Sequence, residues 1–118
     1  MKVVDTATLI SAYTKAKSFD PIALTPRLAE MASDSNEILK ALVQTIRSPQ
    51  ERRRKVMGSM KHAWVPAIYL LDKGNAQVVA LVVHTINSVW TVDERMDFYD
   101  YTKGVASLSA AINNLELE

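Results

Sequence analysis

The longest apolar stretch, AQVVALVVHTINSVW at Ala76–Trp90, most constrains what this chain can fold into. Wound as an α-helix, it places its small and polar side chains on one narrow stripe, comprising Gln77, Ala80, His84, Asn87, Ser88 and Thr91. The remaining positions carry valine, leucine, isoleucine and tryptophan, so the helix needs cover on most sides. We therefore expect residues 76–90 to form a central, buried helix around which the other elements pack.

A second interpretation of the same region is a β-hairpin within residues 64–86. The segment Asp72-Lys73-Gly74-Asn75 is rich in turn-forming residues, and valine-rich runs also make good buried strands. Two observations favour the helix. The polar stripe recurs every 3.6 residues rather than every second residue, and the apolar run is longer than a typical strand. In the helical interpretation Gly74 ends a short preceding helix and Asn75 caps the next one.

Capping side chains predict where the other helices begin, at Asp5 or Thr6, at Pro26 after a turn at Asp20-Pro21, at Asp34, at Ser48 and at Thr91. The helix after Ser48 is expected to continue to Trp64 and to break before Pro66. Gly104 is expected to interrupt the last helical region. The sequence therefore predicts an all-α fold, a compact single-domain bundle of about five to seven helices spanning residues 1–118.

Composition excludes several classes of protein. The chain has no cysteine, which removes disulfides and thiolate chemistry and suits a reducing compartment. Its longest uninterrupted apolar run, Val78–Val83, is far shorter than the roughly 20 residues that a membrane-spanning helix needs. The N-terminus carries Asp5 within its apolar pattern and so does not resemble a secretory signal. We expect a cytoplasmic protein that does not enter membranes.

Charge is balanced overall but uneven along the chain. The net charge is +1, which gives no general attraction to nucleic acid. A basic segment comprises Arg52, Arg53, Arg54, Lys55 and Lys61, with His62 beside it expected to be exposed, whereas residues 92–118 are acidic. The basic segment is interpreted as a solvated helix face or as a docking surface for a protein partner, such as the acidic end of another copy. The alternative is that it contacts nucleic-acid phosphates.

No catalytic signature is present. His84 lies in the polar stripe of the central helix without an evident orienting partner, and is interpreted as satisfied within a helix contact. Asp93, Asp97 and Asp100 share a helix face, and are interpreted as solvated rather than as cation ligands. The sequence contains no glycine-rich phosphate loop and no nucleophile elbow. We expect no catalysis, no metal, no cofactor and no small-molecule substrate.

The last helical region is also rich in aromatic residues. Phe98, Tyr99 and Tyr101 cannot all face the same way, so at least one is expected near the surface, and Tyr99 or Tyr101 is predicted to contribute to a protein interface. Together these features predict a small intracellular protein-binding protein, such as an assembly subunit, an adaptor or an inhibitor. Opposite charge at its two ends favours self-association into a homo-oligomer.

Overall fold

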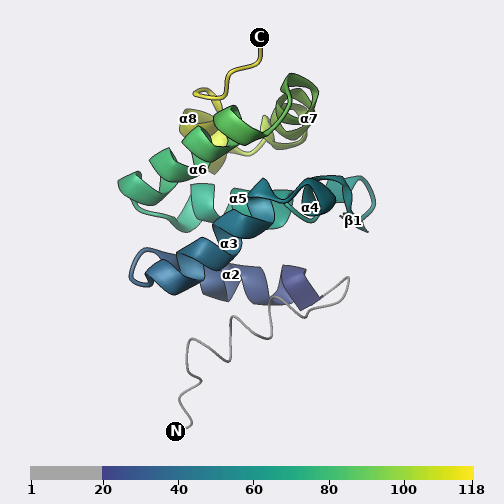
Figure 1. The fold of residues 1–118 in the computed structure, drawn as a ribbon. Helices are drawn as coiled ribbons and strands as arrows, with labels where there is room; N and C mark the ends of the chain where they lie inside the picture. Colours follow the sequence, from purple (N-terminus) through teal and green to yellow (C-terminus); the bar gives the residue numbers. More distant parts are fainter. Residues whose placement is uncertain (1–19) are drawn as a thin grey trace, which may run out of the picture.

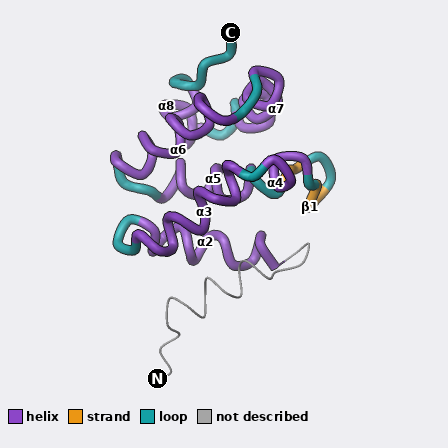
Figure 2. Tube along the Cα trace, viewed as in Figure 1, coloured by secondary structure: helices purple, strands orange, loops and turns teal. Residues whose placement is uncertain are grey.

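A computed structural model describes residues 20–118, and Figure 1 shows their arrangement. The helix predicted from Asp5 or Thr6 lies outside these residues. In the described part the elements are α2 (Asp20–Ala32), α3 (Asn36–Arg47), α4 (Pro49–Arg53), β1 (Lys55–Met57), β2 (Met60–Lys61), α5 (Trp64–Lys73), α6 (Ala76–Val89), α7 (Val92–Thr102), a 3₁₀ turn η1 (Ala106–Leu108) and α8 (Ser109–Ile112). The all-α bundle is therefore confirmed, and the two strands form only a very small hairpin (Figure 2).

The helices pack around one continuous hydrophobic core. Its fully buried members come from α2, α3, α5, α6, α7 and the C-terminal segment, and include Leu28, Leu42, Leu70, Val82, Phe98 and Leu108. Among residues 20–118, no helix combines the length and the apolar character that crossing a membrane would require.

The hairpin considered for residues 64–86 is wrong, because both halves are helices. Gly74 has an extended backbone and caps α5, donating its N–H to the carbonyl of Leu70 at 2.8 Å. Asn75 then caps α6, and its side-chain oxygen accepts the N–H of Val78 at 2.9 Å. The turn-forming residues therefore separate two helices, as the preferred interpretation predicted.

α5 is the enclosed helix, not α6. α5 contacts α2, α3 and α6, and its buried side chains are Trp64, Val65, Pro66, Ala67, Leu70 and Leu71 (Figure 1). The expectation that residues 76–90 lie at the centre of the bundle is wrong in this respect. α6 buries only Val78, Val82, Thr85 and Ile86, and Leu81 keeps 39% of its surface exposed. The apolar composition indicated that this helix needs cover, and residues 20–118 bury only one side of it.

Two predicted helix starts differ in the structure. α2 is continuous through Pro26, whereas a turn followed by a shorter helix was expected. Packing explains the difference, because the neighbouring Thr25, Leu28 and Ala29 are fully buried and offset the hydrogen bond that proline cannot donate. α3 is capped by Ser35 rather than Asp34, with the Ser35 hydroxyl accepting from the N–H of Ile38 at 3.4 Å.

The helix expected to continue from Ser48 to Trp64 ends much earlier. Ser48 does cap α4, but this helix stops at Arg53, and residues 55–61 form a β-hairpin. Gly58 occupies the first central position of the turn with a φ of +56°, a conformation that glycine adopts readily. The hairpin is closed onto α4, because Ala63 donates its N–H to the carbonyl of Glu51 at 2.9 Å. These contacts replace a helix that Gly58 would have weakened.

α7 is attached to the rest of the molecule by aromatic and polar contacts. The Phe98 ring meets the rings of Trp64 and Trp90 edge-on, with centroid distances of 5.9 and 5.3 Å. The guanidinium of Arg95, which is buried, donates to the carbonyl oxygens of Asn87 and Trp90 at 3.1 and 2.7 Å. It also donates to the carbonyl of Glu116, so that it links the end of α6 to the C-terminal segment. α7 ends at Thr102, just before Gly104, as predicted.

Candidate protein-binding surface

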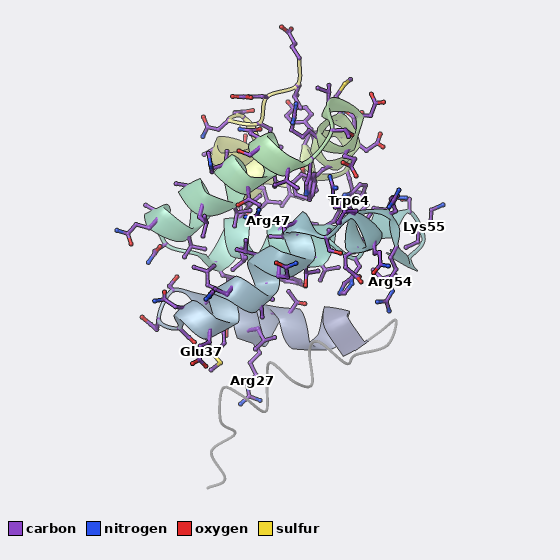
Figure 3. All side chains as sticks on the ribbon, in the orientation of Figure 1. Arg27, Glu37, Arg47, Arg54, Lys55 and Trp64 are labelled. Carbon is purple, nitrogen blue, oxygen red and sulfur yellow. The ribbon has the colours of Figure 1, made fainter. Side chains whose placement is uncertain are left out.

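The predicted basic segment is divided between two elements. Arg52 and Arg53 belong to α4, Arg54 follows it, and Lys55 and Lys61 face each other across the hairpin. Figure 3 shows Arg54 and Lys55 at the hairpin end of the molecule, away from Arg47. The five cations therefore do not form one continuous face of a single helix.

Two of these five arginine and lysine residues form ion pairs within the fold. Arg52 Nη1 lies 2.8 Å from Glu94 Oε1 and donates to the carbonyl of Val89 at 3.0 Å, and its side chain is only 13% exposed. Arg54 Nη1 lies 3.5 Å from Glu51 Oε2. Arg52 therefore holds α4 against the start of α7 rather than facing a partner.

His62 is buried, with 6% of its surface exposed, and the expectation that it faces solvent is wrong. Its Nδ1 contacts Glu51 Oε2, so that one carboxylate serves both His62 and Arg54. The fold of residues 55–61 into a hairpin explains this burial, because it returns His62 to α4 and its N–H donates to the carbonyl of Arg54 at 2.7 Å. The exposed cations that remain are Arg53 and Lys55, with Lys61 partly exposed.

Tyr101 is the tyrosine that reaches the surface. It is 45% exposed, and one side of its ring packs on Trp64 with a centroid distance of 5.1 Å. Tyr99 is partly buried and packs against the hydrophobic core. The expectation that at least one aromatic residue of α7 lies near the surface is confirmed, and the role of either tyrosine in an interface stays a prediction.

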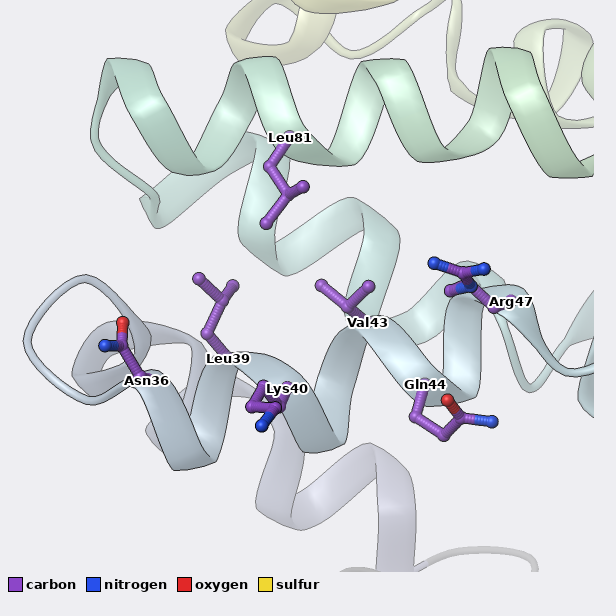
Figure 4. Close-up of a pocket in the computed structure, with 7 residues that line it drawn as sticks. All are labelled: Asn36, Leu39, Lys40, Val43, Gln44, Arg47 and Leu81. Atoms are coloured by element: carbon purple, nitrogen blue, oxygen red, sulfur yellow. The ribbon is translucent and has the colours of Figure 1, made fainter.

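An open apolar surface lies between α3 and α6, and we call it the α3–α6 groove. It has a volume of about 430 Å³ and is lined by Asn36, Leu39, Lys40, Val43, Gln44, Arg47 and Leu81. Figure 4 shows Leu81 of α6 directed toward Leu39 and Val43 of α3. These three side chains make an apolar floor, and the polar and basic side chains of α3 form its rim.

A second hollow runs along α6 beside the C-terminal segment. It measures about 650 Å³ and is lined by Gly74, Ala76, Val79, Ala80, Val83, His84, Asn87 and Asn114. His84 lies there on the exposed side, with its Nε2 3.5 Å from the hydroxyl of Ser88. Hollows on both sides of α6 follow from its partial cover.

The basic rim of the α3–α6 groove is available for contact. Lys40 and Arg47 are both exposed, and within residues 20–118 neither lies within 4.0 Å of a carboxylate oxygen. Glu37, the only acid of α3, does not line the groove. The groove thus combines an apolar floor with two cations that have no acidic partner in the described part of the chain.

Sequence analysis did not identify this groove, although a signal for it was present. α6 has no lysine, arginine, aspartate or glutamate at any position, which is unusual for a helix that faces water on one side. This composition was interpreted as a sign of cover by other parts of the chain. It could equally have indicated cover by another molecule.

The acidic row of α7 lies on the exposed side of that helix. Asp93, Asp97 and Asp100 are all exposed, and Asp100 pairs with Lys103 at 3.3 Å. In the described part of the chain, no cluster of three or more histidine, aspartate or glutamate residues has the arrangement needed to hold a metal ion.

The chain matches no protein-family model, no curated protein and no solved structure. Fold and surface therefore define the class to which it belongs, an all-helical bundle with an open apolar groove.

Proposed function

We propose that this chain is a non-enzymatic protein-binding subunit that recognises a protein partner through the α3–α6 groove. The observation that carries the proposal is the exposure of Leu81, 39%, directly above the partly exposed Leu39 and Val43. An elongated groove with an apolar floor is a common binding site for an amphipathic helix, which inserts apolar side chains at helical spacing.

The composition of the groove supports a peptide or helix rather than a small metabolite. The lining contains a lysine, an arginine and two side-chain amides but no buried polar group that would orient a small molecule. Its rim offers Lys40 and Arg47 to acidic side chains that flank the apolar side of a partner helix. Such rim charges set the association rate and the choice of partner more than the affinity.

The alternative, binding of nucleic-acid phosphates by Arg52, Arg53, Arg54, Lys55 and Lys61, has less support. Arg52 and Arg54 already contact Glu94 and Glu51, which leaves a smaller exposed positive charge than the sequence alone indicated. A titration with nonspecific DNA and RNA at several salt concentrations tests this alternative. Phosphate binding would fall steeply with salt and would be lost in Arg53→Glu/Lys55→Glu.

A lysine in place of Leu81 tests the proposed function, because it puts a charge over the apolar floor without disturbing a buried side chain. The purified wild-type chain is used to capture its partner from host cells, the partner is identified, and binding is then measured again with both purified components. Leu81→Lys should weaken this binding at least roughly tenfold, since interface hot spots cost about 2 kcal/mol or more.

The matched control is Val105→Lys, which introduces the same charge at a similarly exposed apolar residue that does not line the groove. It should bind like the wild type. If the purified partner binds Leu81→Lys as tightly as the wild type, the groove is not the binding surface and the proposal is refuted.

The proposal places the protein in the cytoplasm, where a chain without cysteine is suited to the reducing conditions. Catalysis is not part of the proposed function. His84 and the acidic row of α7, the candidates that sequence analysis weighed for chemistry, are both exposed and do not line a common pocket.

A further inference from the structure

We infer that the occupant of the α3–α6 groove is α7 of a second copy of this chain, so that copies join head to tail. This inference rests on the proposed function, because it names the partner of the same groove. It is argued from the exposed side of α7, from the match of its charges and spacing to the groove, and from the positions of the two surfaces.

The exposed side of α7 forms what we call the α7 ridge, which consists of Val92, Asp93, Met96, Asp97 and Asp100. Val92 and Met96 are 36% and 45% exposed. They stand one turn apart and therefore share one line along the helix. The opposite side of α7 is occupied by Arg95, Phe98 and Thr102, all buried.

The charges of the ridge and the groove are opposite and similarly spaced. Lys40 and Arg47 are seven residues apart on α3, as are Asp93 and Asp100 on α7. Seven residues correspond to about 10.5 Å along a helix, so both acids can face both cations in one arrangement. Asp97 adds a third acid between them. Asp100 also forms an ion pair with Lys103 on the surface. Surface ion pairs of this kind contribute little to stability, so this one does not prevent Asp100 from facing a cation of the groove.

The apolar side chains match in the same way. Leu39 and Val43 are four residues apart on α3, and Val92 and Met96 are four residues apart on α7. One helical turn, about 6 Å, separates the members of each pair. Laying the ridge in the groove would cover Met96 and Leu81, two of the most exposed large apolar side chains in the described part of the chain.

The two surfaces cannot meet within one molecule. Figure 1 draws α3 below α6 and α7 past the C-terminal end of α6, and no ion pair joins the two charge sets in residues 20–118. Within residues 20–118 each copy therefore presents one uncovered ridge and one uncovered groove, the arrangement that produces rings or open chains. A single helix in a single groove buries less than a standard interface, so the association is weak and depends on concentration.

Sedimentation velocity between about 1 μM and about 1 mM tests this inference, a range chosen for weak association. The average mass of the wild type should rise with concentration, and less steeply at high salt, which screens the charge contacts. Lys40→Glu/Arg47→Glu reverses the charge of the groove, and Asp93→Lys/Asp100→Lys reverses the charge of the two acids that would face it. Each variant alone places like charges opposite each other and should associate at least roughly tenfold more weakly.

A one-to-one mixture of the two variants provides the decisive measurement. In the mixture, the acidic groove of the first variant can bind the basic ridge of the second variant. The unchanged basic groove of the second variant can bind the unchanged acidic ridge of the first. Association should therefore return to the wild-type level. Two controls carry the same charge changes on exposed residues elsewhere, Arg53→Glu/Lys55→Glu and Glu30→Lys/Asp34→Lys. Both should associate like the wild type. Circular dichroism confirms that every variant is folded.

Three results would overturn the inference. These are a wild type that stays monomeric over the whole range, a mixture that fails to restore association, and controls that weaken it as much as the groove variant does. The proposed function fails separately. If copies do not associate but Leu81→Lys still prevents binding of a purified partner, the groove binds a different protein, and only the identity of its occupant is wrong.

Discussion

Replacing Phe98 with leucine should destabilise the fold by about 1–4.5 kcal/mol. Phe98 is fully buried, and its ring packs edge-on against both tryptophans, with interplanar angles of 72° to Trp64 and 89° to Trp90. Edge-to-face pairs contribute about 0.5–1.5 kcal/mol each, so losing two costs about 1–3 kcal/mol. The change of shape in a packed core adds up to about 1.5 kcal/mol.

The substitution should also affect the α7 ridge, because the buried Phe98 ring anchors α7 to Trp64 of α5 and to Trp90 at the end of α6. A loss of this size is a large part of a typical stability of about 5–15 kcal/mol. The free energy of unfolding can be measured by urea titration with two signals. Far-ultraviolet circular dichroism follows the helices, and fluorescence follows Trp64 and Trp90, the two tryptophans of the chain.

Tyr101→Leu is the matched comparison. It removes one aromatic contact with Trp64 from a ring that is 45% exposed, and should cost no more than about 1 kcal/mol. A double-mutant cycle with Trp90→Leu isolates one pair, and a coupling energy of about 0.5–1.5 kcal/mol is expected between positions 90 and 98. If Phe98→Leu costs no more than Tyr101→Leu, or the coupling is zero, the reasoning about this aromatic cluster is refuted.

Two further predictions concern helix ends. Gly74→Ala should destabilise the fold by about 1–3 kcal/mol, because an added Cβ would lie 2.6 Å from both the Leu70 carbonyl oxygen and a Val78 methyl carbon. The control is Gly104→Ala, where a Cβ meets nothing within 4 Å. Equal melting temperatures for the two variants would contradict the close packing at Gly74. Glu94→Ala should lower the free energy of unfolding, measured by chemical denaturation, by about 2–3 kcal/mol. The reason is that Glu94 Oε1 accepts hydrogen bonds from both the N–H of Thr91 and Arg52 Nη1, each at 2.8 Å. The control Asp93→Ala, in the same turn, should change this free energy by less than about 0.5 kcal/mol.

Much of the secondary structure could be predicted because the signals are local. Ser48, Asn75 and Thr91 each accept the N–H three residues later, and each opens the helix that its position indicated. Glu94 completes the predicted capping box with Thr91. The hairpin of residues 55–61 was not predicted, because Val56 and Met60 also fit a helical pattern, and the contacts of Glu51 and His62 that hold the strands against α4 cannot be seen in the sequence.

The candidate site could be predicted only in part. The basic segment and the two tyrosines were identified, but their contacts were not, since Arg52 pairs with Glu94, 42 positions away. Arg95 shows the same limitation. In the sequence, Arg95 lies among charged residues of a helix, a position typical of the surface. Its burial depends on carbonyl groups at the end of α6 and near the C-terminus.

By itself, the sequence determined the all-helical fold, most of the capping residues and the absence of charge on α6. Tertiary structure alone decided that α5 is enclosed while α6 is half covered, that His62 and Arg95 are buried, and that a groove opens between α3 and α6. The physical reason is the range of the interactions involved. A helix cap needs partners within one turn of the chain, whereas burial depends on which distant segments pack together, as when the indole N–H of Trp90 donates to the carbonyl of Ile46, 44 positions earlier.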